Sequence, residues 1–202
     1  MGKHLTSADY VSMPWKNGKG TTTELVTCPH KDTEQTAAFS WRISIADMVE
    51  DGPFSTFPGI DRTLTVISGH GLTLKGPENF TVACTPLMPT MFSGDLELTG
   101  LLREGAVKNF NVMTDRGVCS ADVEVQDLGS NAVKFGGENF QVFIYVLEAS
   151  DPIEVHCDDQ LLQVAQGEGY LAIVGALVQV TKPRGCNSRI IAVSILNETP
   201  YR

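Results

Sequence analysis

Hydrophobic and polar residues alternate along much of this chain with the period of a β-strand. The clearest example is residues 39–45, which read Phe-Ser-Trp-Arg-Ile-Ser-Ile. Successive side chains of a strand point to opposite faces of a sheet, so this pattern predicts a half-buried strand. Other short segments of strand character are residues 64–68, 71–75, 79–83, 96–102, 140–147, 153–156, 161–165, 170–174, 177–181 and 190–196. Helical periodicity is scarce, with a helix expected only in short connections such as residues 6–10, so the sequence predicts an all-β protein.

The predicted strands are separated by Gly, Pro, Asn and Asp, which is typical of a sandwich or barrel. Residues 64–74 and 162–172 repeat one plan: a strand, a Gly-x-Gly corner expected to form a tight hairpin, and a second strand. Two copies of this plan suggest two barrels. We therefore expect an N-terminal barrel over residues 1–115 and a C-terminal barrel over residues 116–202, packed as one compact unit. Alternating residues 119–125 could form a strand that crosses between them.

The charge of the chain restricts the partners that it can attract. Its 202 residues include 24 acidic and 15 basic side chains, for a net charge of −9. Such a protein is repelled by nucleic acid and by anionic membranes, so neither is an expected partner. The N-terminus lacks the apolar core of a signal peptide, and the longest apolar run, residues 170–180, is too short to span a bilayer. We expect a cytoplasmic protein, and we leave a homodimer open.

Cysteine and histidine give no support for a metal or cofactor. The five cysteines are widely spaced and form no Cys-x-x-Cys pair, which fits reduced thiols better than disulfides or a zinc cluster. The four histidines, His4, His30, His70 and His156, each lack a second histidine at ligand spacing. We expect no cofactor.

A glycine-rich stretch near the N-terminus carries side chains that could contact a ligand. Trp15, Lys16 and Asn17 precede Gly18 and Gly20. Lysine can neutralise a carboxylate, asparagine can donate and accept hydrogen bonds, and tryptophan supplies an apolar wall. A phosphate-binding loop is excluded because the upstream glycine of that motif is missing. The alternative is a glycine-rich edge loop without a binding role.

A second stretch, residues 52–62, leads into the predicted strand at residue 64. Its prolines and glycines fix the path of the chain, and we expect Phe54 and Phe57 to pin it to the barrel. The stretch ends with Asp61 and Arg62, and an arginine at a barrel mouth can bind a carboxylate through two parallel hydrogen bonds. The alternative is that Arg62 forms an ion pair with a neighbouring acid and only locks the loop.

Two polar pairs lie on alternating segments. Arg42 and Ser44 share one face of the strand at residues 39–45, and the sequence does not decide whether that face lines the barrel or meets solvent. Asn109 and Asn111 share a face in the same way, either as ligand contacts or as an internal hydrogen-bond bracket.

These motifs together resemble the HutD/Ves family of bacterial proteins, in which HutD is associated with histidine-utilisation operons. The resemblance rests on Pro14-Trp15-Lys16-Asn17-Gly18 with Gly20, Thr22 and Glu24, on Trp41-Arg42-Ile43-Ser44, on Gly52-Pro53-Phe54-Ser55 and Phe57-Pro58-Gly59-Ile60-Asp61-Arg62, and on Phe92-Ser93-Gly94-Asp95 and Phe110-Asn111-Val112-Met113. The motifs cover the first half of the chain in a fixed order, whereas the second half is similar mainly in strand character. Lys19 departs from a more usual glycine and Asn109 from a more usual aspartate.

The resemblance implies a double-stranded β-helix, the cupin jelly roll, with two barrels in one chain (a bicupin) and without the usual cupin metal ligands. It also implies a non-enzymatic protein that binds a small carboxylate, with N-formylglutamate the suggested ligand, and that modulates histidine utilisation. Arg62 is the expected carboxylate anchor. The full set of expected ligand-binding residues is Arg62, Lys16, Asn17, Trp15, Arg42, Ser44, Asn111 and Glu24.

Two other functions stay open at this point. The first is a cupin-type isomerase or hydrolase that acts on a small acid, with Glu24 or Asp61 as the base, although neither has an evident partner to tune its pKa. The second is a protein-interaction or stress-response module, as in the Ves branch of the family. We lean towards a protein that is not an enzyme.

Overall fold

The computed structural model describes residues 2–15, 18, 20–30 and 38–197. These residues form strands, turns and irregular segments and no α-helix, so the prediction of an all-β protein is confirmed. None of them belongs to a helix that is long and apolar enough to cross a membrane. The chain divides into two compact units, which we call the first unit (Val11–Cys119) and the second unit (Met1–Tyr10 with Ser120–Arg202).

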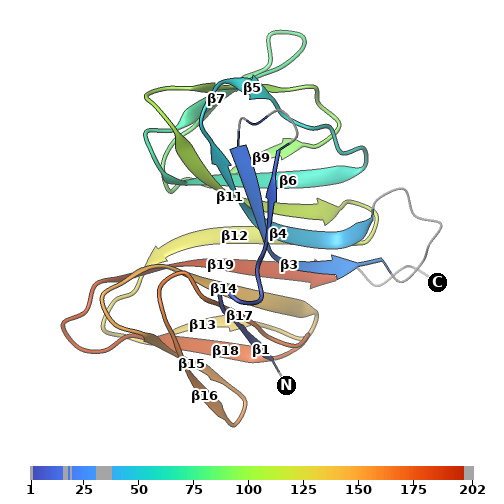
Figure 1. The fold of residues 1–202 in the computed structure, drawn as a ribbon. Helices are drawn as coiled ribbons and strands as arrows, with labels where there is room; N and C mark the ends of the chain where they lie inside the picture. The colour runs from blue at the N-terminus through green and yellow to red at the C-terminus, as the bar shows by residue number, and fades with distance from the viewer. Residues whose placement is uncertain (1, 16–17, 19, 31–37, 198–202) are drawn as a thin grey trace. The chain divides into compact units, whose positions relative to one another are not determined.

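The first unit consists of a six-stranded sheet and a four-stranded sheet (Figure 1). The six-stranded sheet has the order β2-β3-β4-β11-β6-β9, and the four-stranded sheet has the order β5-β10-β7-β8. The strands are β2 (Val11–Pro14), β3 (Gly20–Pro29), β4 (Phe39–Met48), β5 (Gly52–Pro53), β6 (Ile60–Ser68), β7 (Leu72–Lys75), β8 (Thr81–Cys84), β9 (Thr90–Ser93), β10 (Thr99–Leu102) and β11 (Val107–Asp115).

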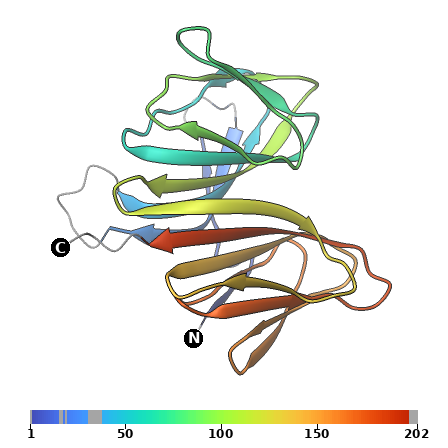
Figure 2. The same ribbon diagram turned by 180° about the vertical axis from the view of Figure 1, so that it is seen from behind.

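The second unit also pairs two sheets, of five and four strands, and Figure 2 shows β19 running between β12 and β14. The five-stranded sheet has the order β1-β17-β14-β19-β12, and the four-stranded sheet has the order β13-β18-β15-β16. The strands are β1 (Lys3–Leu5), β12 (Cys119–Asp127), β13 (Val133–Gly136), β14 (Phe140–Ala149), β15 (Ile153–Cys157), β16 (Gln160–Val164), β17 (Gly169–Leu171), β18 (Leu177–Thr181) and β19 (Ser188–Asn197).

The observed division differs from the expected one at the N-terminus. The first unit ends at Cys119, four residues beyond the predicted boundary, and the first ten residues belong to the second unit. Their place follows from strand pairing, because β1 forms an antiparallel ladder with β17 in which Lys3 faces Leu171. Local pattern alone cannot assign a segment to a partner strand as distant in the sequence as β17 is from β1.

The Gly-x-Gly corners do not close hairpins, contrary to the prediction. The corner at Gly69 and Gly71 joins β6 of the six-stranded sheet to β7 of the four-stranded sheet. Both glycines have positive φ, at 92° and 96°, and a Cβ on Gly69 would approach the backbone oxygen of Ala106 to 2.5 Å. The corner after β16 likewise leads to β17 in the other sheet of the second unit. These glycines therefore let the chain change sheets, which is the step that builds a sandwich.

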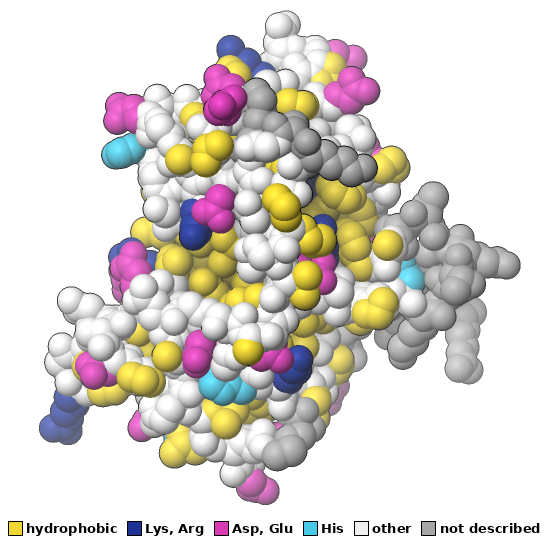
Figure 3. Space-filling model, viewed as in Figure 1, with side chains coloured by type: hydrophobic (Ala, Val, Ile, Leu, Met, Phe, Trp, Pro, Cys, Tyr) yellow, Lys and Arg dark blue, Asp and Glu magenta, His cyan; other side chains and the backbone are white. Residues whose placement is uncertain are grey.

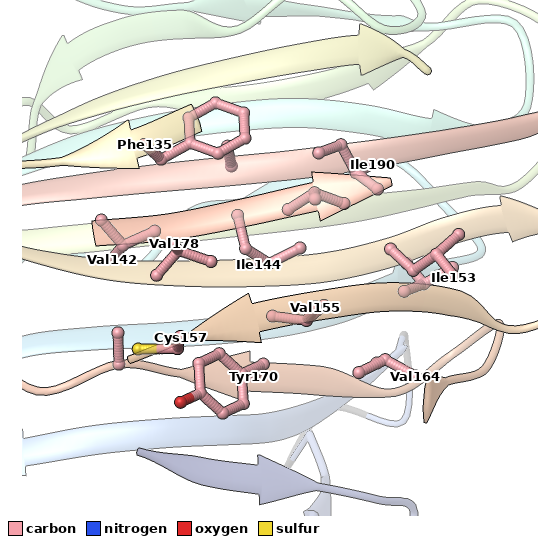
Figure 4. Close-up of a cluster of buried hydrophobic side chains, with 14 of the residues drawn as sticks. Phe135, Val142, Ile144, Ile153, Val155, Cys157, Val164, Tyr170, Val178 and Ile190 are labelled. Atoms are coloured by element: carbon pink, nitrogen blue, oxygen red, sulfur yellow. The ribbon is translucent and has the colours of Figure 1, made fainter. Parts of the chain in front are cut away.

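The interior of the second unit is filled by apolar side chains. Ile144, Ile153, Val155 and Tyr170 are all fully buried and pack in one cluster between the two sheets (Figure 4). Strands of both sheets supply this cluster, as expected for two sheets that bury their inner faces against each other.

The interior of the first unit contains a smaller apolar cluster of Phe39, Ile60 and Met113 besides its main apolar core. Leu64, Val66, Leu72 and Leu74 are completely buried and form its core with neighbouring residues. Along the same inner face of β4, β6 and β11, the side chains change to arginine, serine and asparagine. The candidate site lies where the inner face changes from apolar to polar side chains.

Candidate functional site

A cavity of about 480 Å³ lies against the polar part of this inner face in the first unit. Its polar lining comes from three neighbouring strands of the six-stranded sheet, β4, β11 and β6, with Thr22 on β3. Its apolar walls include the end of β2 with Trp15, and Pro53 of β5 with Phe54 and Phe57 after it. This volume is within the range of small-molecule pockets. Apolar walls with a few convergent polar groups are also typical of such pockets.

Strand register brings the polar residues together. Arg42 on β4 and Arg62 on β6 both lie opposite Met113 on the central strand β11, so the three side chains form one row across the sheet. In the next row, Ser44 lies opposite Asn111. Residues that lie directly opposite each other on paired strands share a face of the sheet. The five residues of these two rows, Arg42, Met113, Arg62, Ser44 and Asn111, all line the cavity. The sequence did not decide whether the face of β4 with Arg42 and Ser44 lines the interior or meets solvent. In the structure, this face lines the cavity.

Arg62 is held in the cavity wall by aromatic rings and a backbone oxygen. Its guanidinium carbon lies 5.4 Å, 5.5 Å and 5.0 Å from the ring centres of Phe54, Phe57 and Phe92, distances typical of cation–π contacts. Its Nη1 donates a hydrogen bond to the backbone oxygen of Ser55 at 3.1 Å. The residue is only 9% exposed.

Arg62 has no acidic partner within 4.0 Å among the described residues, and its buried Nε has no hydrogen-bond acceptor there. The neighbouring acid, Asp61, pairs instead with Arg116, whose Nη2 lies 2.7 Å from its Oδ1. The loop-locking ion pair considered for Arg62 is therefore formed by other residues. Burial, and secondarily the charge of Arg42, lowers the pKa of Arg62 to about 10, so its positive charge at neutral pH lies in a poorly solvated place.

Arg42, by contrast, is neutralised within the protein. Its Nε lies 2.7 Å from Oε2 of Glu24 on β3, and both side chains are largely buried. Glu24 therefore contacts a residue that lines the cavity. It is not among the cavity-lining residues, although the sequence placed it in the ligand-binding set.

The two asparagines form the internal hydrogen-bond bracket, which is one of the two roles that the sequence left open. Asn111 Nδ2 donates to the backbone oxygen of Asn109 at 3.2 Å, which is an internal bracket. The side chain of Asn109 nevertheless retains a buried Oδ1 without a hydrogen-bond donor, although the residue is only 1% exposed. Buried polar atoms of proteins are usually hydrogen-bonded, so this atom is an exception among the described residues.

Trp15 forms part of the apolar wall, where its Nε1 donates to Oγ1 of Thr22 at 2.8 Å. The stretch that contains it is less of a loop than expected, because β2 and β3 occupy most of residues 11–29. Lys16 and Asn17, predicted as ligand contacts, lie outside the described residues, as does Lys19.

Sequence reasoning missed part of this arrangement. It treated Phe54 and Phe57 only as anchors of their loop, and it did not connect Phe92 with Arg62. The register provides the missing signal, since Arg62 lies directly opposite Phe92 on β9. It also left Asn109 out of the expected site, although the shared face with Asn111 was visible in the sequence.

The described residues outside the cavity form no metal-binding cluster that would compete with it as a candidate site. No group of three or more His, Cys, Asp or Glu side chains within the described ranges is arranged to hold a metal ion. Acidic side chains are spread over the face of the molecule shown in Figure 3 and do not gather in one patch. The positive charge of the cavity is therefore a local feature of an acidic protein.

Comparisons with known proteins point to one family over most of the chain. The sequence pattern of the HutD family matches residues 7–183. A Ves protein of Citrobacter koseri is 36% identical over 131 residues, which cover 64% of this chain and 65% of the relative. An uncharacterised protein from the hutC 3′ region of Pseudomonas putida is 38% identical over 109 residues, which cover 54% and 56%. The chain thus matches less than two thirds of the length of these relatives.

Solved structures extend the likeness to nearly the whole fold. A conserved protein of unknown function from Pseudomonas aeruginosa superposes with a TM-score of 0.83 at 26% identity, covering 96% of this chain and 98% of that one. HutD from Pseudomonas fluorescens, in a formate condition, gives 0.77 at 27%, covering 98% and 100%. A cupin 2 conserved barrel protein from Leptotrichia buccalis, at 9% identity, covers 93% and 96% with a TM-score of 0.55. This last likeness concerns the fold alone, which is cupin-like.

Proposed function

Because this chain belongs to the HutD family, we propose that its cavity binds a small carboxylate and that binding modulates histidine utilisation without catalysis. N-formylglutamate is the first ligand to test, since the family resemblance suggests it. Arg62 anchors the carboxylate in this proposal. Asn111, Ser44 and Trp15 contact the rest of the ligand, and Lys16 and Asn17 stay in the proposed set.

The observation that carries the proposal is the buried guanidinium of Arg62 without an acidic partner among the described residues. Burial of a charge costs several kcal/mol unless a counter-charge and hydrogen bonds compensate for it. The three phenylalanine rings compensate in part, and Nε still lacks an acceptor. A carboxylate in the cavity would supply the missing negative charge, and charge-assisted hydrogen bonds to a guanidinium are short and strong.

The two acids considered for catalysis give the enzymatic alternative little support. Glu24 is engaged by Arg42 at 2.7 Å, and Asp61 is engaged by Arg116 at 2.7 Å. Asp61 also lies outside the cavity lining. A general base must reach the proton that it removes, and neither acid is placed free in the cavity to do so.

Titration calorimetry with N-formylglutamate tests the proposal. Arg62→Ala should weaken binding about tenfold or more, because a charge-assisted hydrogen bond contributes about 1.5–3 kcal/mol. Arg103→Ala is the matched control, since it removes a positive charge from the exposed surface of the same unit and should leave the affinity unchanged. Equal affinities of the wild type and Arg62→Ala would refute the role of Arg62, and consumption of the acid during the titration would identify an enzyme.

A further inference from the structure

We propose that Arg42 is a second anion-binding residue of the cavity, so that the preferred ligands are dicarboxylates held between Arg62 and Arg42. The inference rests on the proposed carboxylate binding and specifies which carboxylates bind most tightly. It assigns to Arg42 the carboxylate that Arg62 does not bind.

The first argument is that two arginines face one cavity from the same sheet. Arg42 on β4 and Arg62 on β6 both lie opposite Met113 on β11, and all three residues line the cavity. The spacing of neighbouring strands puts the Cα atoms of the two arginines about 10 Å apart. Arginine side chains are long and flexible, so a small dicarboxylate that lies between these two positions can contact both guanidinium groups.

The second argument is electrostatic. After burial, the positive charge of Arg42 is the other cause of the lowered pKa of Arg62, so the two cations repel each other at the cavity wall. A monocarboxylate on Arg62 supplies an anion to one of them. A dicarboxylate supplies one to each and removes more of the repulsion, and each carboxylate can accept charge-assisted hydrogen bonds from its arginine.

The third argument is that Glu24 leaves part of Arg42 available. Oε2 of Glu24 lies 2.7 Å from Nε of Arg42, yet this buried Nε has no hydrogen-bond partner among the described residues. Glu24 therefore offsets the charge of Arg42 from the Nε side without a directed bond. The guanidinium also carries two terminal nitrogens with two N–H donors each. A ligand carboxylate on these nitrogens lies nearer to the cation than to Glu24, so attraction exceeds repulsion.

Three N-formyl compounds provide matched probes of the second carboxylate. N-formylglutamine and N-formylisoglutamine each replace one of the two carboxylates of N-formylglutamate by a neutral amide. We expect the wild type to bind N-formylglutamate about tenfold more tightly than either amide, a difference of about 1.4 kcal/mol. In Arg42→Gln this preference should disappear, because the second carboxylate has lost its cation. Titration calorimetry gives the three dissociation constants for each variant.

Further variants separate the role of Arg42 from the effect of an unpaired acid or a damaged fold. Glu24→Gln/Arg42→Gln removes the pair as a whole, leaves no unpaired acid, and should also abolish the preference. Glu24→Gln keeps Arg42 and removes the charge that competes for it, so the preference should rise severalfold. Lys108→Gln is the matched control, since Lys108 pairs with Asp47 on the same sheet outside the cavity lining and its loss should keep the wild-type ratio.

The outcomes distinguish the inference from the proposed function. If the diacid and both amides bind with equal affinity and depend on Arg62, the cavity binds carboxylates and the role of Arg42 is wrong. If Glu24→Gln/Arg42→Gln keeps the tenfold preference, another group holds the second carboxylate and the inference is refuted. If none of the three compounds binds, the proposed function fails together with the inference.

Discussion

Arg62 combines a full positive charge with surroundings that solvate it poorly. Each cation–π contact contributes about 0.5–2 kcal/mol, and the desolvation of a guanidinium costs several kcal/mol. The rings of Phe54, Phe57 and Phe92 therefore hold the side chain in place without fully compensating for its burial. Under the proposed function, such a residue would weaken the free protein and strengthen the complex with a carboxylate, a trade-off that is common at binding sites.

The trade-off predicts opposite effects of one substitution on stability and on binding. Arg62→Met keeps much of the volume and the apolar contacts but removes the charge, so the free energy of unfolding should rise by about 1 kcal/mol while carboxylate binding is lost. Urea unfolding of the ligand-free protein measures the first effect, and calorimetry measures the second. A marked loss of stability in Arg62→Met would mean that the guanidinium is mainly structural.

At the scale of elements, the turn before β6 is held by an ion-pair network outside the cavity. Nη2 of Arg116 lies 2.7 Å from Asp61 and 3.0 Å from Asp95, and Asp95 also accepts a hydrogen bond from the backbone of Gly59 at 2.8 Å. The network joins the start of β6 to the turns after β9 and β11. It therefore fixes the strand end from which Arg62 enters the cavity.

This network predicts a defined dependence of stability on pH. Hydrogen bonds from Ser93, Gly59 and Arg116 lower the pKa of Asp95 from 3.8 to about 2. The stabilisation by its carboxylate should therefore be present above about pH 4 and disappear as the pH falls towards 2. Urea unfolding from pH 6 to pH 2 should show Asp95→Asn less stable than the wild type at pH 6, with the difference shrinking below pH 4. Asp122→Asn, at an exposed position without these contacts, is the control; a constant difference for Asp95→Asn would contradict the explanation.

At the scale of elements, the alternation of apolar and polar residues predicted some features of the strands and missed others. Alternation placed Arg42 and Ser44 on one face of a strand correctly, because side-chain period is a property of the strand itself. It could not choose the cavity face, since Trp41, Ile43 and Ser44 are all buried in the structure. It also missed β3, where Gly20 and consecutive threonines resemble a loop and pairing with β4 supplies the order.

Long-range pairing set the other limit of the prediction. The family resemblance pointed to Arg62 and its neighbours, and the cupin-like fold was predicted correctly. The contact of Arg62 with Phe92, and the row that Arg42 and Arg62 form with Met113, depend on strands that are distant in the sequence. Such pairings follow from the register of the whole sheet and not from any short window.

At the scale of the whole molecule, the two units are each built from two sheets, but their interiors are filled differently. The interior of the second unit is occupied by side chains such as Ile144 and Tyr170, which pack to complete burial. In the first unit, part of the interior is a cavity whose mainly apolar lining includes buried polar groups such as Arg62 and Asn111. A tightly packed interior contributes stability, whereas polar groups left without partners contribute binding capacity at a cost in stability.

The overall charge adds a prediction about the rate of binding. An anionic ligand approaches a protein of net charge −9, so long-range repulsion should slow its encounter with the cavity. Salt screens this repulsion over about 10 Å at 0.1 M. The association rate of an anionic carboxylate, measured by stopped-flow, should therefore rise about two- to fivefold between low salt and 0.3 M salt. The dissociation rate should change less, because Arg62 acts at short range and is shielded from ions by its burial. A fall of the association rate with salt would show instead that positive groups around the cavity dominate the field that the ligand meets.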